Sequence, residues 1–343
     1  MERALDREVL ALALGEHESL PSANELQGLI AAVEVGLFVG NPSIPEDLLE
    51  TAWYLHGVAS AREADETYSV ARQRRAFQVS AHVFDLALAE SRRSRAERLK
   101  LGFAAQVGYR RGELDPNAMA VFARLAPHID AERPLLGHIE TVALEAGVAL
   151  LGFNVRLLFR LLKAFRTQYD ELRQSIDVAN LRGTLFGASA GVVQGADDLF
   201  RYLTLGDPDR LARAKQSLDA AARAQSGVDD LTARWVAAHL LSIADESEGT
   251  SVWTVLPPDV PAAARRALTL TSPPVLTLWK PQAELLAGSH PNPLSPGARR
   301  VVLSVPTSAG KTLLAQLLMV SHISTGEGDR TPFIGPSLVR VRG

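Results

Sequence analysis

The sequence of 343 residues contains no cysteine. This absence excludes disulfide bonds, thiolate zinc sites and cysteine nucleophiles from its chemistry. A strong charge is also missing, because 39 acidic residues nearly balance 36 lysines and arginines and leave a formal net charge of −3. Such a chain has no general attraction for polyanions, so a nucleic-acid site would have to be a local basic patch.

Long apolar runs are missing as well. The longest, residues 141–155, is interrupted by Glu145 and Asn154, and it is shorter than the roughly 20 residues that a membrane-spanning helix needs. The N-terminal residues 1–20 carry acidic side chains within their apolar pattern and lack a basic start, which is typical of a helix and not of a signal peptide. We therefore expect a cytoplasmic protein with no membrane partner.

A helical pattern dominates residues 1–245, where apolar side chains recur every three or four positions. The breaks in this pattern contain proline or glycine, as expected where helices end. They fall at 41–47, 114–117, 132–137 and 205–210. The sequence therefore predicts an all-helical accessory domain over residues 1–245.

Two pairs of segments within this domain resemble each other. Residues 51–61 and 100–112 each interleave small and bulky side chains, and the amphipathic segments 74–90 and 116–126 follow them. A period of roughly 48 residues would suit a helical repeat. Small residues at helix crossings give the same pattern in any closely packed bundle, so the fold class is mainly α, with either a bundle or a solenoid-like arrangement.

Prolines end the long helices after residue 245. The range 246–275 contains Pro257, Pro258, Pro261, Pro273 and Pro274, and this density predicts a proline-rich linker. The remaining range, 276–343, is expected to begin a second domain. A short helix, a polar loop and an apolar strand are predicted there at 282–288, 289–297 and 299–305.

A phosphate-binding loop is predicted at residues 306–312, PTSAGKT. Such a loop needs inward-pointing backbone amides, the positive N-terminal end of a helix, a lysine and a hydroxyl group for Mg²⁺. Gly310 lets the backbone approach the phosphates, Lys311 supplies the charge and Thr312 supplies the Mg²⁺ ligand. The preceding loop residues are Pro306, Thr307, Ser308 and Ala309. Because a predicted strand precedes the loop and an amphipathic helix follows it, the motif is expected to bind a nucleotide with Mg²⁺.

The form of the loop indicates a family. Val305 stands at the first position, where the general phosphate-loop pattern has glycine. Pro-Thr-x-x-Gly-Lys-Thr after an apolar residue resembles motif I of superfamily 2 helicases and translocases of the DEAD/DExH kind. Upstream, Trp279, Pro281 and Gln282 resemble the aromatic-x-Pro-x-Gln element that these proteins place before motif I. The resemblance implies that Gln282 reads the adenine edge and that Trp279 packs near the base; the alternative is a polar residue at a helix start and a buried anchor.

The resemblance also implies a fold and a function. Residues 276–343 would be an incomplete RecA-like α/β segment that binds ATP with Mg²⁺, and DNA or RNA would be the partner of the complete motor. No Asp-Glu-x-His or Asp-Glu-Ala-Asp motif follows the loop in this sequence. We therefore expect the chain to be the N-terminal part of a longer, truncated helicase-like protein. Whether it is itself an enzyme stays open, and ATP hydrolysis is not expected from it.

Two other functions remain open at this stage. The chain could be a helical scaffold that binds proteins and carries another type of P-loop NTPase, or a remnant without activity. A basic stripe in residues 153–174 contains Arg156, Arg160 and Lys163, with Arg166 displaced toward one flank. It is either a contact surface for phosphates or a solvated face whose arginine stems cover apolar neighbours. The pattern alone favours the solvated face.

Overall fold

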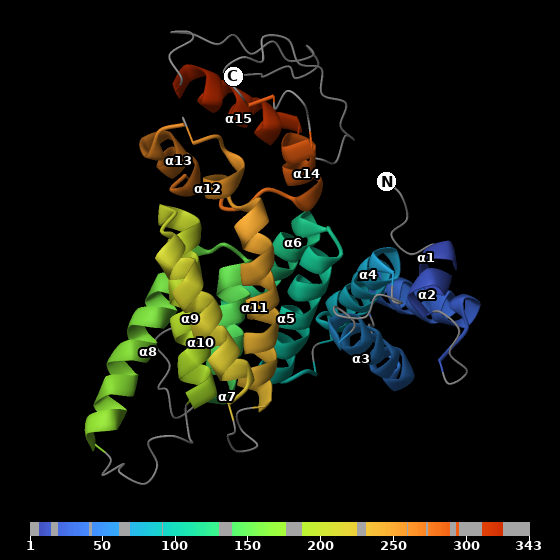
Figure 1. Cartoon of the computed structure of the whole chain (residues 1–343). Helices are drawn as coiled ribbons and strands as arrows, with labels where there is room; N and C mark the ends of the chain where they lie inside the picture. Colours follow the sequence, from blue (N-terminus) through green and yellow to red (C-terminus); the bar gives the residue numbers. More distant parts are fainter. Residues whose placement is uncertain are drawn as a thin grey trace, which may run out of the picture. The chain divides into compact units, whose positions relative to one another are not determined.

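The computed structural model of the chain is mainly helical (Figure 1). It describes residues 7–14, 20–40, 43–61, 69–90, 92–129, 139–175, 187–224, 231–258, 260–271, 274–288, 293–294 and 311–324. Within these ranges the prediction of an all-helical N-terminal region is confirmed. The described residues contain no strand beyond an isolated antiparallel bridge between Ser251 and Thr277. The predicted strand 299–305 lies outside them, so the α/β segment stays a prediction.

The helices follow one another along the whole described chain. In order they are α1 (Arg7–Leu14), α2 (Ala23–Phe38), α3 (Glu46–Ala61), α4 (Val70–Ala87), α5 (Arg95–Arg111), α6 (Asp115–Leu125), the 3₁₀ helix η2 (Ala126–His128), α7 (Ile139–Leu151), α8 (Val155–Ser175), α9 (Gly187–Leu205), α10 (Pro208–Ala222), α11 (Leu231–Thr250), α12 (Val252–Val255), α13 (Ala262–Thr269), α14 (Lys280–Gly288) and α15 (Lys311–Ser324). Among the described helices, none combines the length and apolar character that a membrane span requires.

The chain divides into two compact units. Unit 1 consists of residues 1–201 and 207–245, and unit 2 consists of residues 202–206 and 246–343. The last residues of α9 and α11 therefore belong to unit 2.

Two helices of unit 1 begin with the same local signal. Ser22 accepts a hydrogen bond from the Glu25 backbone N–H (3.3 Å), while the Glu25 carboxylate accepts one from the Ser22 N–H (2.8 Å). Ser94 and Glu97 make the same exchange at the start of α5, at 3.2 and 2.8 Å. These capping boxes satisfy first-turn amides that have no partner inside the helix, and they lower the pKa of both carboxyl groups.

Helix α5 forms the centre of the core of unit 1. Every residue from Leu101 to Tyr109 is buried, and α5 contacts α4, α6 and α7. A Cβ atom added at Gly108 would lie 2.9 Å from both the Ala81 Cβ and the Phe77 carbonyl oxygen. Glycine is therefore needed at this crossing, because a larger residue would separate α5 from α4. The small residues seen in the sequence here mark a close approach of helices.

Unit 2 has a core of its own, although its helices are short. The backbone N–H of Leu278 donates to the Thr250 carbonyl (2.7 Å), and the N–H of Val252 donates to the Leu276 carbonyl (3.2 Å). These bonds fold the chain back on itself around a buried apolar cluster. The cluster contains Val252, Leu256, Val260, Leu268, Leu278, Ala283, Leu286, Leu294, Leu314 and Leu317.

The range 246–275, which the sequence predicted as a linker, contains α12 and α13 and contributes to this cluster. Arg265 stabilises its irregular turn. The Arg265 guanidinium donates to the carbonyl oxygens of Trp253 (2.7 Å), Val260 (3.1 Å) and Leu256 (3.3 Å). Prolines in this turn have no N–H to donate, so its carbonyl groups need a partner from elsewhere. One long side chain supplies it, and proline content alone does not reveal this.

Candidate nucleotide-binding segment

The predicted phosphate loop is described only at its C-terminal end. Its residues Pro306, Thr307, Ser308, Ala309 and Gly310 lie outside the described residues. Helix α15 begins at Lys311, and Thr312 in its first turn is exposed. The first-turn N–H groups of a helix have no partners within the helix, and they carry the positive end of its dipole. Lys311 and Thr312 are the first two described residues of α15, and the N-terminal end of a helix is where anions bind.

The aromatic-x-Pro-x-Gln element forms the start of α14. The Gln282 side-chain oxygen accepts a hydrogen bond from the Trp279 N–H (3.1 Å). The backbone N–H groups of Gln282 and Ala283 donate to the Trp279 carbonyl at 2.8 and 3.0 Å. Gln282 is only 1% exposed, and Trp279 is half-buried. Gln282 therefore acts as the polar residue at a helix start, and its role toward adenine stays a prediction.

The two predicted elements belong to one packed unit. Ala283 and Leu286 of α14 lie in the same buried cluster as Leu314 and Leu317 of α15. The spacing of three between Leu314 and Leu317 puts both on one face of α15, and both are almost completely buried, at 2% and 0% exposed. The structure thus brings the upstream element and the helix of the loop onto a common core.

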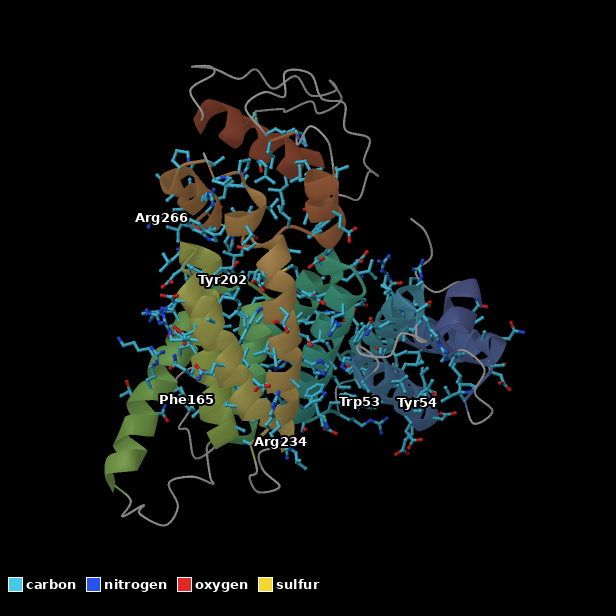
Figure 2. All side chains as sticks on the ribbon, in the orientation of Figure 1. Trp53, Tyr54, Phe165, Tyr202, Arg234 and Arg266 are labelled. Carbon is cyan, nitrogen blue, oxygen red and sulfur yellow. The ribbon has the colours of Figure 1, made fainter. Side chains whose placement is uncertain are left out.

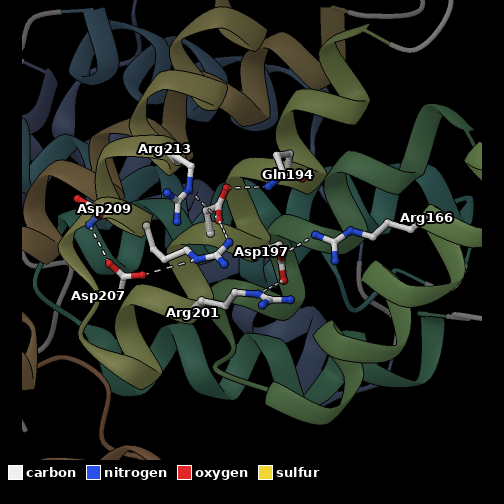
Figure 3. Close-up of polar contacts among 9 residues, drawn as sticks. Arg166, Gln194, Asp197, Arg201, Asp207, Asp209 and Arg213 are labelled. Atoms are coloured by element: carbon white, nitrogen blue, oxygen red, sulfur yellow. Dashed lines mark hydrogen bonds and ion pairs between the residues drawn. The ribbon is translucent and has the colours of Figure 1, made fainter. Parts of the chain in front are cut away.

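A network of buried acids in unit 1 was missed by the sequence analysis (Figure 3). Asp197 and Asp198 are neighbours on α9 and are 4% and 1% exposed. Asp197 forms ion pairs with Arg166 of α8 and with Arg201 of α9, whose Nε lies 3.1 Å away. A buried carboxylate requires such partners, because burial without them is strongly unfavourable. Two consecutive acids inside an apolar helix were the only signal in the sequence.

Asp198 has a corresponding set of partners, partly on α10. It accepts a hydrogen bond from Arg210 (2.6 Å) and another from the Gln194 amide (2.7 Å), and the Nε of Arg213 lies 3.8 Å away. Exposed Asp207 lies 3.8 Å from the Nε of Arg210. The two buried acids thus connect α8, α9 and α10 through arginines whose side chains remain partly exposed.

A pair of buried histidines lies elsewhere in unit 1. The Nε2 atoms of His56 on α3 and His239 on α11 are 3.3 Å apart, and both rings contact Trp235 edgewise or at a tilt. Burial among aromatic rings, followed by the His239 and Arg111 charges, holds the pKa of His56 well below its ordinary value of 6.5. Burial, followed by Arg111, lowers the pKa of His239 to about 3. A separation of 183 residues leaves no spacing pattern from which to predict the pair.

Comparisons with known proteins do not assign this chain to a family. No protein-family model matches it, and no curated protein matches it either. Among the described residues, no group of three or more histidines, aspartates and glutamates could hold a metal ion. The function therefore has to be inferred from the residues of the chain itself.

Proposed function

We propose that this chain binds ATP through residues 306–312 and is part of an ATP-dependent nucleic-acid helicase or translocase of the DEAD/DExH kind. The motif PTSAGKT carries this proposal. It is supported by the start of α15 at Lys311, because a phosphate loop requires a helix that begins at its Gly-Lys-Thr end. The common core of α14 and α15 also supports it, since both predicted elements have to serve one nucleotide.

Each residue type fits its assigned partner. Backbone amides of the loop up to Gly310 would bind phosphate oxygens, and Lys311 would supply a positive charge to the outer phosphates. Thr312 would hold Mg²⁺ through its hydroxyl, and its exposure in the first turn of α15 suits that role. Mg²⁺, when bound, neutralises charge on the phosphates.

Base recognition is assigned to Gln282, with Trp279 beside the base. The Gln282 amide oxygen accepts a hydrogen bond from the Trp279 N–H. The same bond fixes the orientation of the amide. Because Gln282 is 1% exposed, adenine can reach it only if the surrounding side chains of unit 2 move apart. We therefore expect weak base selectivity from the isolated chain.

ATP hydrolysis is not part of the proposal for these 343 residues. Hydrolysis requires a carboxylate that holds Mg²⁺ and positions water, together with cations that stabilise the transferred phosphoryl group. The family resemblance assigns these groups to motifs beyond motif I, which this sequence does not contain. The expected activity is nucleotide binding.

The test is a titration of the full chain with a fluorescent ATP analogue, with and without Mg²⁺. We expect Thr312→Ala to abolish the gain in affinity that Mg²⁺ gives, while Lys100→Ala, an exposed cation on α5, changes nothing. Competition with unlabelled ATP and GTP measures base selectivity, which Gln282→Ala should remove. Binding that is independent of Mg²⁺ and unaffected by Thr312→Ala would contradict the assignment.

A helical scaffold that carries another type of P-loop NTPase is the second candidate. It is favoured by exposed apolar side chains at the end of α2, where Val35, Phe38 and Val39 are 63%, 93% and 69% exposed. Contiguous exposed apolar residues often mark protein interfaces. This candidate predicts that Gln282→Ala leaves the ratio of ATP to GTP affinity unchanged and that the chain binds no oligonucleotide.

A further inference from the structure

Helix α8 presents a basic face to solvent. Arg156, Arg160 and Lys163 are exposed, and the described part of the chain offers none of them an acidic partner. Phe159 lies among them and is 57% exposed. Because the residues are three or four positions apart, they form one stripe along the helix. Among the described residues, no acid forms an ion pair with Arg156, Arg160 or Lys163, and an aromatic ring lies within the stripe that they form.

The stripe continues across α9 and α10. Arg166 lies on the flank of α8 that contacts α9, where it pairs with Asp197, and Figure 2 shows nitrogen atoms gathered beside α8 and α9. Beyond Asp197 the network of Figure 3 leads to Asp198 and the arginines of α10. We call the whole set the α8–α10 basic surface. It comprises Arg156, Phe159, Arg160, Lys163, Arg166, Arg201, Arg210 and Arg213.

Each of the two buried carboxylates is paired with more than one positive charge. Asp197 and Asp198 each have two arginine partners, although one would balance each charge. These arginines keep 31% to 48% of their side chains exposed. Around the two buried acids, the described side chains of the surface comprise seven cations and the four carboxylates of Asp197, Asp198, Asp207 and Asp209. The buried acids hold several arginines in fixed positions at one surface. Such a local concentration of positive charge suits a polyanion.

The apolar face of α8 indicates which polyanion. Leu157, Leu158, Leu161, Leu162 and Phe165 are at most 6% exposed, so this helix cannot insert an apolar face into a lipid surface, as membrane-binding amphipathic helices do. The stripe from Arg156 to Arg166 is about 15 Å long at about 1.5 Å per residue. At the spacing of about 3.4 Å along each strand of a duplex, that length corresponds to about four phosphates, and to fewer if the strand is extended. Basic side chains around an exposed aromatic ring are typical of proteins that bind single strands, in which bases stack on the ring.

We propose that the α8–α10 basic surface binds single-stranded nucleic acid, with the cations contacting phosphates and Phe159 stacking on a base. The inference extends the proposed function by giving the helical unit its own nucleic-acid site. It does not require the nucleotide site, which lies in a different unit. The two ideas can therefore fail separately.

The experiment is fluorescence anisotropy of a labelled 20-nucleotide oligothymidylate with the full chain and no ATP, over a series of salt concentrations. The triple variant Arg156→Gln/Arg160→Gln/Lys163→Gln removes three contacts. We expect at least a tenfold loss of affinity and a fall of about 2 in the slope of log K against log salt. The matched control, Arg74→Gln/Arg92→Gln/Lys100→Gln, has the same charge change elsewhere in unit 1 and should retain the affinity and the slope.

The aromatic ring is tested separately. Phe159→Ala should weaken binding roughly tenfold while leaving the salt slope unchanged, because stacking releases no counterions. Phe38→Ala, which removes a ring that is 93% exposed on α2, should have no effect. Circular dichroism checks that every variant is folded, including the control, in which Arg74 loses its ion pair with Glu113 (2.7 Å).

Three results would overturn the inference. Equal losses in the two triple variants would show attraction by overall charge only. The surface would be assigned to membranes if the triple variant Arg156→Gln/Arg160→Gln/Lys163→Gln (the stripe variant) kept its affinity for the oligonucleotide but lost binding to vesicles of phosphatidylserine. Loss of oligonucleotide binding in Lys311→Ala, with the stripe variant unaffected, would place the nucleic-acid site in unit 2. If Lys311→Ala abolishes only ATP binding, both proposals stand; if ATP never binds but the stripe results hold, only the proposed function fails.

Discussion

The buried histidine pair makes the stability of unit 1 dependent on pH in a defined direction. In the unfolded chain, His56 and His239 have pKa values of about 6.5. In the folded protein both pKa values are lowered, that of His239 to about 3. Below pH 6.5 the unfolded chain therefore binds protons that the folded chain does not, so stability falls as the pH falls. Above about pH 7.5 both states are almost entirely neutral at these positions, and the pair contributes almost no pH dependence.

The size of the effect follows from the same values. At pH 5.5, one unit below the unfolded pKa, each histidine should reduce the free energy of unfolding by about 1.4 kcal/mol relative to pH 7.5. The two together should cost about 3 kcal/mol. Carboxyl groups with ordinary pKa values near 4 titrate below this window.

The assay is urea unfolding at pH 7.5 and at pH 5.5, followed by tryptophan fluorescence. Trp53 and Trp235 contact the histidines, so their emission reports the unfolding of this part of the core. The double variant His56→Gln/His239→Gln should lose less than about 1 kcal/mol between the two pH values, and His239→Gln alone should lose about half as much as the wild type. Equal losses in the wild type and the double variant would refute the reasoning, because the pH dependence would then arise elsewhere.

Two further predictions concern packing and buried charge in unit 1. Gly108→Ala should destabilise the protein by about 1–3 kcal/mol, because the added Cβ would lie 2.9 Å from backbone and side-chain atoms of α4. Gly28→Ala in α2, with nothing within 4 Å of the added Cβ, should stabilise it by up to about 1 kcal/mol. Thermal unfolding of the two variants should therefore show shifts of opposite sign. Glu145→Ala should lower the free energy of unfolding in urea by about 3–5 kcal/mol, because Glu145 is 0% exposed and pairs with Arg95 at 2.7 Å. Asp219→Ala, which breaks an exposed pair, should change the free energy of unfolding by less than about 1 kcal/mol. Similar effects of these two changes would contradict the importance of burial.

Local signals in the sequence were sufficient for the helical part of the fold. Apolar spacing predicted the helices, and the serine and glutamate at positions 94 and 97 mark the start of α5 by a bond between neighbours in sequence. What the sequence did not reveal depends on long-range contacts. The compact turn around Arg265 needs a guanidinium that reaches several carbonyl groups, and the histidine pair joins residues 183 positions apart.

The candidate nucleotide site was predictable only as a motif. Lys311 and Thr312 belong to a pattern whose residues are adjacent in sequence, and the start of α15 at Lys311 is compatible with it. The function of the α8–α10 basic surface could not be decided from the sequence, because the exposure of Phe159 and the arginines anchored by Asp197 and Asp198 arise from the packing of three helices.

The central claim is that Lys311 belongs to a nucleotide-binding loop. The most direct test is a titration of the full chain with a fluorescent ATP analogue and Mg²⁺, comparing the wild type with Lys311→Ala and with the control Lys100→Ala, and checking that each variant is folded. We predict saturable binding by the wild type and the control and loss of binding by Lys311→Ala, because the outer phosphates would lose their only lysine from the loop. Equal binding by all three proteins would place the nucleotide site elsewhere and contradict the proposed function.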